Sequence, residues 1–147
     1  MSAQTFWFNL LLFSMGSLQI LMFPPVLAVL ILLVAGLVFS FIRQEPLSSE
    51  AWHWSYWLVL TQLLFYPAIV AVGVLFPAST WPNPPHENVT GGRWLDALSC
   101  GSVATSCFWV YRMKGLRWFA ASLVGLIELL VSCARFVMGM RITGQWL

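Results

Sequence analysis

The feature that most constrains the fold is an apolar run of 37 residues, from Phe6 to Ile42. Its interruptions are Asn9, Gln19, some serines and glycines, and the pair Pro24-Pro25. As one straight helix the run would be about 55 Å long, at a rise of about 1.5 Å per residue. The hydrocarbon core of a bilayer is only about 30 Å thick, so one straight crossing is implausible. The run must bend or break if it lies in a membrane.

The composition of the chain favours a membrane setting. Hydrophobic residues make up 60% of the chain and charged residues 8%, whereas a soluble domain carries about 25% charged residues. A soluble fold of 147 residues could not bury so much apolar surface. Because the apolar runs are continuous rather than alternating, a transmembrane barrel is disfavoured. We expect an all-α integral membrane protein that forms a single membrane domain, 1–147.

The break in the first run is expected at Pro24, because Pro25 disfavours the helical conformation of the residue before it. The break leaves two arms of 17 residues each, 6–22 and 26–42, close to the shortest length that spans a bilayer. We predict a tight helical hairpin of two short spans. The alternative is one span, 26–42, preceded by a re-entrant or interfacial segment. The bundle then has four transmembrane helices instead of five.

Three further spans are predicted, covering residues 52–76, 93–111 and 118–140. The last two are expected to form a C-terminal antiparallel hairpin around the short basic turn 112–117. The segment 77–92 is rich in proline and glycine, which predicts an exposed irregular loop. Basic residues in short loops favour the cytoplasmic side. The loops 112–117 and 43–50 are therefore predicted to be cytoplasmic, and the loop 77–92 external.

Three charged residues fall inside the last two predicted spans: Asp96, Glu128 and Arg135. A charge in hydrocarbon costs roughly 2.5–3.5 kcal/mol on insertion scales, so such residues tend to be paired, buried against protein or functional. In an antiparallel hairpin that turns about residue 115 or 116, Asp96 lies level with Arg135. We expect these two to form an ion pair, and a role in fixing the register of the two helices is favoured over a functional one.

Glu128 has no such cation at its own depth, where Ser102 and Gln62 of other spans are expected. Three interpretations are open. Glu128 is a neutral acid that hydrogen-bonds Ser102, Gln62 or a backbone carbonyl, or it is part of a proton or cation path with Arg135 and Asp96. In the third interpretation it faces a partner subunit or a quinone-like headgroup. The first interpretation is favoured.

Metal, cofactor and modification sites are only weakly indicated. The cysteines Cys100, Cys107 and Cys133 form no C-x-x-C pair, and two histidines cannot complete a zinc set, so no metal site is predicted. His53 could ligate a haem or chlorin, but its tryptophan neighbours favour an interfacial aromatic belt. No cofactor is assigned. Asn88 begins a glycosylation sequon in the predicted external loop, which matters only if the source glycosylates.

Function is constrained mostly by exclusion. The chain has no catalytic motif, so no catalytic residue is assigned and an enzyme is disfavoured. A net charge of +2, without a basic cluster interleaved with aromatics, argues against nucleic acid. The first hypothesis is a non-catalytic accessory or scaffold subunit of a larger membrane complex, in contact with lipid and with other membrane subunits or copies of itself. The second is a small homo-oligomeric transporter or channel that uses Glu128, Arg135, Asp96 and Gln62. The third is a pigment-, haem- or quinone-binding protein.

Overall fold

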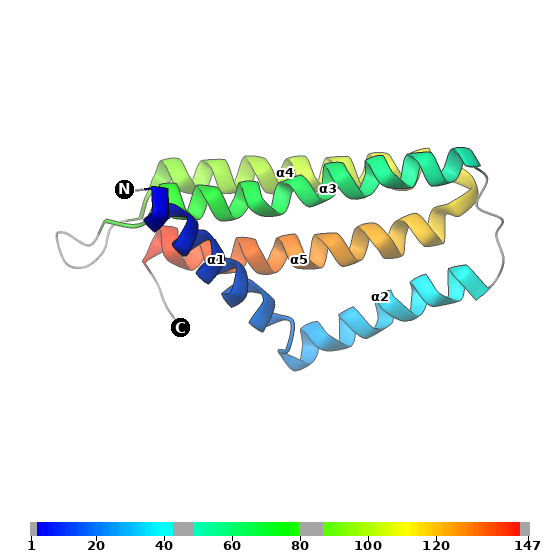
Figure 1. Ribbon diagram of the computed structural model, residues 1–147, viewed down its shortest axis with the longest axis horizontal. Helices are drawn as coiled ribbons and strands as arrows, with labels where there is room; N and C mark the ends of the chain where they lie inside the picture. The colour runs from blue at the N-terminus through cyan, green and yellow to red at the C-terminus, as the bar shows by residue number, and fades with distance from the viewer. Residues whose placement is uncertain (1–2, 43–48, 80–86, 145–147) are drawn as a thin grey trace.

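The computed structural model describes residues 3–42, 49–79 and 87–144. Their regular elements are α1 (Ala3–Ile20), α2 (Pro24–Ile42), α3 (Ser49–Leu75), α4 (Val89–Arg112), the short 3-10 turn η1 (Lys114–Leu116) and α5 (Arg117–Thr143). The prediction of an all-helical protein with five α-helices is confirmed for this part of the chain (Figure 1). Three of the described segments are long and apolar enough to cross a membrane: α2, Trp52–Leu75 of α3, and α5.

The helix α5 is the central element of the fold. In Figure 1, α3 and α4 run along one side of α5, α2 lies along the other, and α1 crosses α5 obliquely between the end of α3 and the start of α2. All four of these helices contact α5. Ala120, Ala134 and Met138 of α5 are completely buried, as are Ile69 and Val70 of α3. The direction in which a side chain leaves α5 therefore decides whether it meets the α3–α4 pair or the first two helices.

Glycines allow α5 to approach its neighbours closely. A Cβ atom built at Gly73 of α3 would lie 2.1 Å from Sδ of Met138, and one built at Gly125 of α5 would lie 2.7 Å from Cδ2 of Leu33. Both distances are far below van der Waals contact. Small residues at helix contacts are typical of membrane proteins, because packing drives the association of helices in lipid. The close α3–α5 and α2–α5 contacts therefore depend on glycine, which has no side chain, at positions 73 and 125.

The first two helices do not form the predicted tight hairpin. The helix α1 packs near the end of α5, where the Arg141 guanidinium carbon lies 4.2 Å from the centre of the Phe13 ring. The helix α2 packs near the start of α5, where the ring centres of Phe41 and Phe119 are 5.6 Å apart. The two helices thus follow one another along α5, joined by the turn at 21–23 (Figure 1). The hairpin prediction is wrong because α5 offers each arm a separate apolar surface.

Several helix boundaries also differ from the predicted spans, and two of them have a clear physical reason. The helix α2 begins at Pro24 rather than at residue 26, because the first turn of a helix needs no N–H from proline and its fixed φ suits that position. The helix α4 begins at Val89 rather than at residue 93, so the predicted loop 77–92 ends at Asn88. The Asn88 Oδ1 atom accepts a hydrogen bond of 3.0 Å from the Gly91 amide and caps the helix. The predicted spans 93–111 and 118–140 lie within α4 and α5.

Candidate functional site

Four polar side chains from three helices meet between α3, α4 and α5. They are Gln62 of α3, Ser102 and Ser106 of α4, and Glu128 of α5, and together they are called the Glu128 cluster. Gln62 and Ser102 are completely buried and Ser106 is 8% exposed. Glu128 is half-buried. Because buried polar groups cost free energy unless they are hydrogen-bonded, the partners of these four side chains define the site.

Both serine hydroxyls of the cluster donate to the same carboxylate oxygen. Ser106 Oγ lies 2.5 Å from Glu128 Oε1, and Ser102 Oγ is also hydrogen-bonded to that atom. Gln62 Nε2 donates to Ser106 Oγ at 3.1 Å, and Gln62 Oε1 lies 3.5 Å from Ser102 Oγ. A hydroxyl carries one proton, so Ser102 serves Glu128 or Gln62 but not both at once. One network therefore joins three helices at a single carboxyl group.

The serine spacing explains how α4 supplies two donors. Residues four apart lie on the same face of a helix, one turn from each other, so Ser102 and Ser106 both face α5. Ser102 and Gln62 are the partners that the sequence predicts for Glu128, and Ser106 is an additional one. The signal for Ser106 was this same four-residue spacing, taken one turn further along α4.

Glu128 is held by neutral donors. Among the described residues, Arg135 forms an ion pair with Asp96, and no basic side chain forms an ion pair with Glu128. The cluster brings four oxygen-bearing side chains together, and oxygen ligands suit protons and small hard cations. The arrangement is able to hold a proton on the carboxyl group or a small cation beside it. The same hydrogen bonds can also serve only to hold α3, α4 and α5 together.

The structure brings Asp96 and Arg135 together on the outside of α4 and α5. Arg135 Nη2 lies 2.7 Å from Asp96 Oδ1. The side chains remain 69% and 50% exposed, respectively, for Asp96 and Arg135. No hydrogen bond or ion pair links Arg135 to Glu128 within the described residues. The three charges therefore form two separate sites instead of one continuous row.

The other candidate residues lie apart from both sites. His53 is exposed on α3, and its Nε2 atom accepts a long hydrogen bond of 3.4 Å from Trp57 Nε1. Asn88 caps α4, and its Nδ2 atom lies 3.4 Å from the Pro77 carbonyl oxygen. In the part of the chain that the structure describes, no group of three His, Cys, Asp or Glu side chains is placed to hold a metal.

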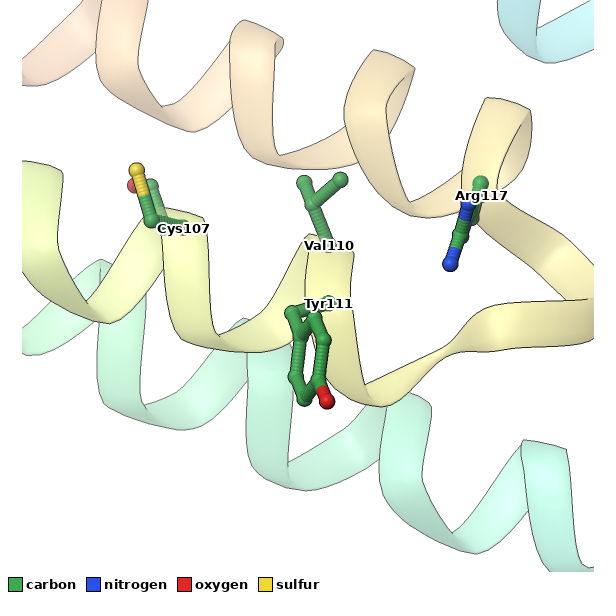
Figure 2. Close-up of a pocket in the computed structure, with 5 residues that line it drawn as sticks. Cys107, Val110, Tyr111 and Arg117 are labelled. Atoms are coloured by element: carbon green, nitrogen blue, oxygen red, sulfur yellow. The ribbon is translucent and has the colours of Figure 1, made fainter.

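A groove of about 480 Å³ lies along the second half of α4, beside the start of α5 (Figure 2). Its lining residues are Ser106, Cys107, Val110, Tyr111 and Arg117. In Figure 2, Val110 points from α4 toward α5, and Arg117 comes from the first turn of α5. Because Ser106 also belongs to the Glu128 cluster, the groove reaches one edge of that cluster. This groove was not predictable from the sequence, because it depends on how α4 and α5 pack.

No family model, curated protein or solved structure matches the chain.

Proposed function

We propose that the chain is a multi-pass integral membrane protein that serves as a non-catalytic accessory or scaffold subunit of a larger membrane complex. The observation that carries this proposal is the Asp96–Arg135 ion pair, which lies half-exposed on the outside of α4 and α5. A water-exposed ion pair would need no explanation. In a transmembrane segment, the same exposure leaves two charges facing lipid.

The depth of the pair makes this exposure significant. Asp96 lies three residues after Arg93, and Arg135 lies six residues before Arg141. If these two arginines mark the external edge of the bilayer, the pair lies about 4.5–9 Å inside it, at about 1.5 Å per residue. Charges inside the hydrocarbon are rare and usually face protein or water. A polar surface of a partner chain over Asp96 and Arg135 would lower the cost of placing them there.

The exposed side chains of α4 include a row of small residues. On α1 and α2 the exposed side chains are large and apolar, as expected for contact with lipid, and include Trp7, Phe8, Leu32, Phe39 and Ile42. The exposed face of α4 carries large apolar side chains too, and between them small ones at intervals of three or four residues: Ala97, Cys100 and Ala104. Small residues at this spacing let two helices approach closely in a membrane. These small residues lie on the same helix as Asp96, which supports α4 as the side that meets another chain.

The proposal includes a topology of four crossings. The helices α1 and α2 together make the first crossing, with a break between them, and α3, α4 and α5 make the others. The loops 112–117 and 43–50 are cytoplasmic and the loop at 77–88 is external, in line with the basic residues of 112–117. α4 is less apolar than its neighbours because it carries Arg93 and Asp96.

The test is purification in a mild detergent, followed by mass analysis of the intact assembly. We expect different membrane proteins to co-purify with the chain, and Asp96→Asn or Arg135→Gln to release them. The control is Glu50→Gln, which changes an exposed acid outside the proposed partner surface. A chain that purifies alone, from native membranes and without loss of fold, would contradict the subunit proposal.

A second candidate function is a homo-oligomeric transporter or channel, which is favoured by the half-buried carboxyl group of the Glu128 cluster. Intramembrane acids without a cationic partner often mark proton or cation pathways. In sealed vesicles, Glu128→Gln should then abolish proton or cation flux, whereas Glu87→Gln, an exposed acid outside the helices, should not. Unchanged flux in Glu128→Gln excludes this function. A visible absorption spectrum of the purified protein tests the third possibility, a pigment or haem at His53.

A further inference from the structure

The groove beside α4 has a chemical character that neither proposed function uses. Cys107 and Val110 form apolar walls, Tyr111 adds an amphipathic ring, and Arg117 is the charged residue of the lining (Figure 2). The groove, about 480 Å³ in volume, is open along one side and does not enclose an occupant. An occupant that matches these walls needs a long apolar part and one anionic group.

Three basic residues lie near the turn between α4 and α5, and of these Arg117 has no partner among the described residues. The guanidinium carbon of Arg112 lies 4.8 Å from the centre of the Trp54 ring, and Nζ of Lys114 lies 5.3 Å from that of the Tyr111 ring. Arg117 is exposed and forms no ion pair, hydrogen bond or ring contact with the residues that the structure describes. Its guanidinium is therefore available to an anion.

The inner wall of the groove offers little to a polar ligand. The Ser106 hydroxyl donates to Glu128 and its oxygen accepts from Gln62, so the donor capacity of Ser106 is used inside the cluster. Cys107 is an exposed free thiol, which behaves as a small apolar group. The groove is thus apolar along its length and cationic at one end.

We propose that this groove binds an anionic phospholipid, with the phosphate on Arg117 and an acyl chain along Val110 and Cys107. The guanidinium fork matches phosphate oxygens in geometry and charge. This placement rests on the membrane topology proposed above, in which Arg117 and Tyr111 lie at the cytoplasmic headgroup level, where basic residues attract anionic lipids and tyrosine rings are enriched.

Native mass spectrometry of the purified full chain tests the proposal, with phosphatidylglycerol and phosphatidylcholine of identical acyl chains as probes. The wild type should bind phosphatidylglycerol about fivefold more tightly, as expected for one basic residue near an anionic headgroup. Arg117→Gln should lose this preference, and Arg117→Lys should retain part of it. Arg93→Gln, at the far end of α4, should retain all of it. Inorganic phosphate should not displace the lipid.

A second measurement places the lipid in the groove. Cys107 and Cys100 are both exposed on α4, but only Cys107 lines the groove. In two variants that each retain one of these cysteines, phosphatidylglycerol should slow maleimide labelling of Cys107 and leave that of Cys100 unchanged. Equal binding of the two lipids, or a preference that survives in Arg117→Gln, would overturn the proposal. Co-purification of partner proteins with the Asp96→Asn and Arg135→Gln variants is measured independently of lipid binding. Either proposal can therefore fail without the other.

Discussion

At the scale of single residues, the side of α4 or α5 on which a polar side chain lies decides whether it is buried, as Ser102 is, or exposed, as Asp96 is. The rise per residue and the turn near residue 115 placed Asp96 level with Arg135, and the structure brings them to 2.7 Å. Depth alone does not tell whether a pair faces the core or the surface. The exposure of this pair, like the contribution of Ser106 to the Glu128 cluster, depends on the rotation of α4 and α5 about their axes, which is set by packing.

The hydrogen bonds of Ser106 yield a stability prediction. Ser106→Ala removes a donor to Glu128 Oε1 and the acceptor of Gln62 Nε2, and leaves both groups partly unsatisfied in the interior. The expected loss is about 1–3 kcal/mol of unfolding free energy. The control is Ser99→Ala, since the Ser99 hydroxyl bonds the Leu95 carbonyl of its own helix at 2.7 Å. Thermal unfolding in detergent measures both variants, and equal midpoints would show that the cluster contributes nothing to stability.

At the scale of helices, the sequence was informative about where elements break and uninformative about where they go next. Pro24-Pro25 marked the interruption of the first apolar run because proline lacks the N–H of a continuing helix. The direction taken after the break depends on the surface that α5 presents, which is not encoded in residues 6–42 alone. The start of α4 also depends on a contact outside the apolar pattern, because the Asn88 side chain caps the helix and extends it into a segment rich in glycine.

The contact of α3 with α5 yields a prediction at this scale. Gly73→Ala places a Cβ atom 2.1 Å from Sδ and 2.7 Å from Cβ of Met138, so the two helices must separate or Met138 must repack. Overpacking of this kind costs typically about 1–3 kcal/mol. Gly139→Ala is the matched control, because nothing lies within 4 Å of its Cβ position and alanine favours a helix. The expected order of thermal midpoints is Gly139→Ala at or above wild type, with Gly73→Ala below it; the reverse order would contradict the observed packing.

At the scale of the whole molecule, the path of the first two helices decides how many times the chain crosses. The beginning of α1 and the end of α5 lie at the same end of the molecule (Figure 1). A five-span arrangement with a tight initial hairpin would place them at opposite ends. The all-helical architecture was predictable from composition and uninterrupted apolar runs, because those depend on the solvent rather than on contacts. The path of the chain after residue 20 was not predictable, because it depends on one turn.

This difference can be measured in sealed vesicles. If the proposed topology holds, epitopes placed before Ala3 and after Gly144 should be reached by an impermeant reagent from the same side of the membrane. An epitope in the 112–117 turn should be reached from the other side. Labelling of the two flanking epitopes from opposite sides would restore the five-span arrangement and contradict the four-crossing topology.

The central position of α5 has a consequence for the order of biosynthesis. A chain is made from its N-terminus, so the helix that contacts the other four is the last of them to leave the ribosome. α2 buries no residue of its own and packs mainly on α5, so in the proposed topology it enters the bilayer before its main neighbour is made. Its uniformly apolar surface suits this order of synthesis, because an apolar helix is stable in lipid before a protein partner packs against it.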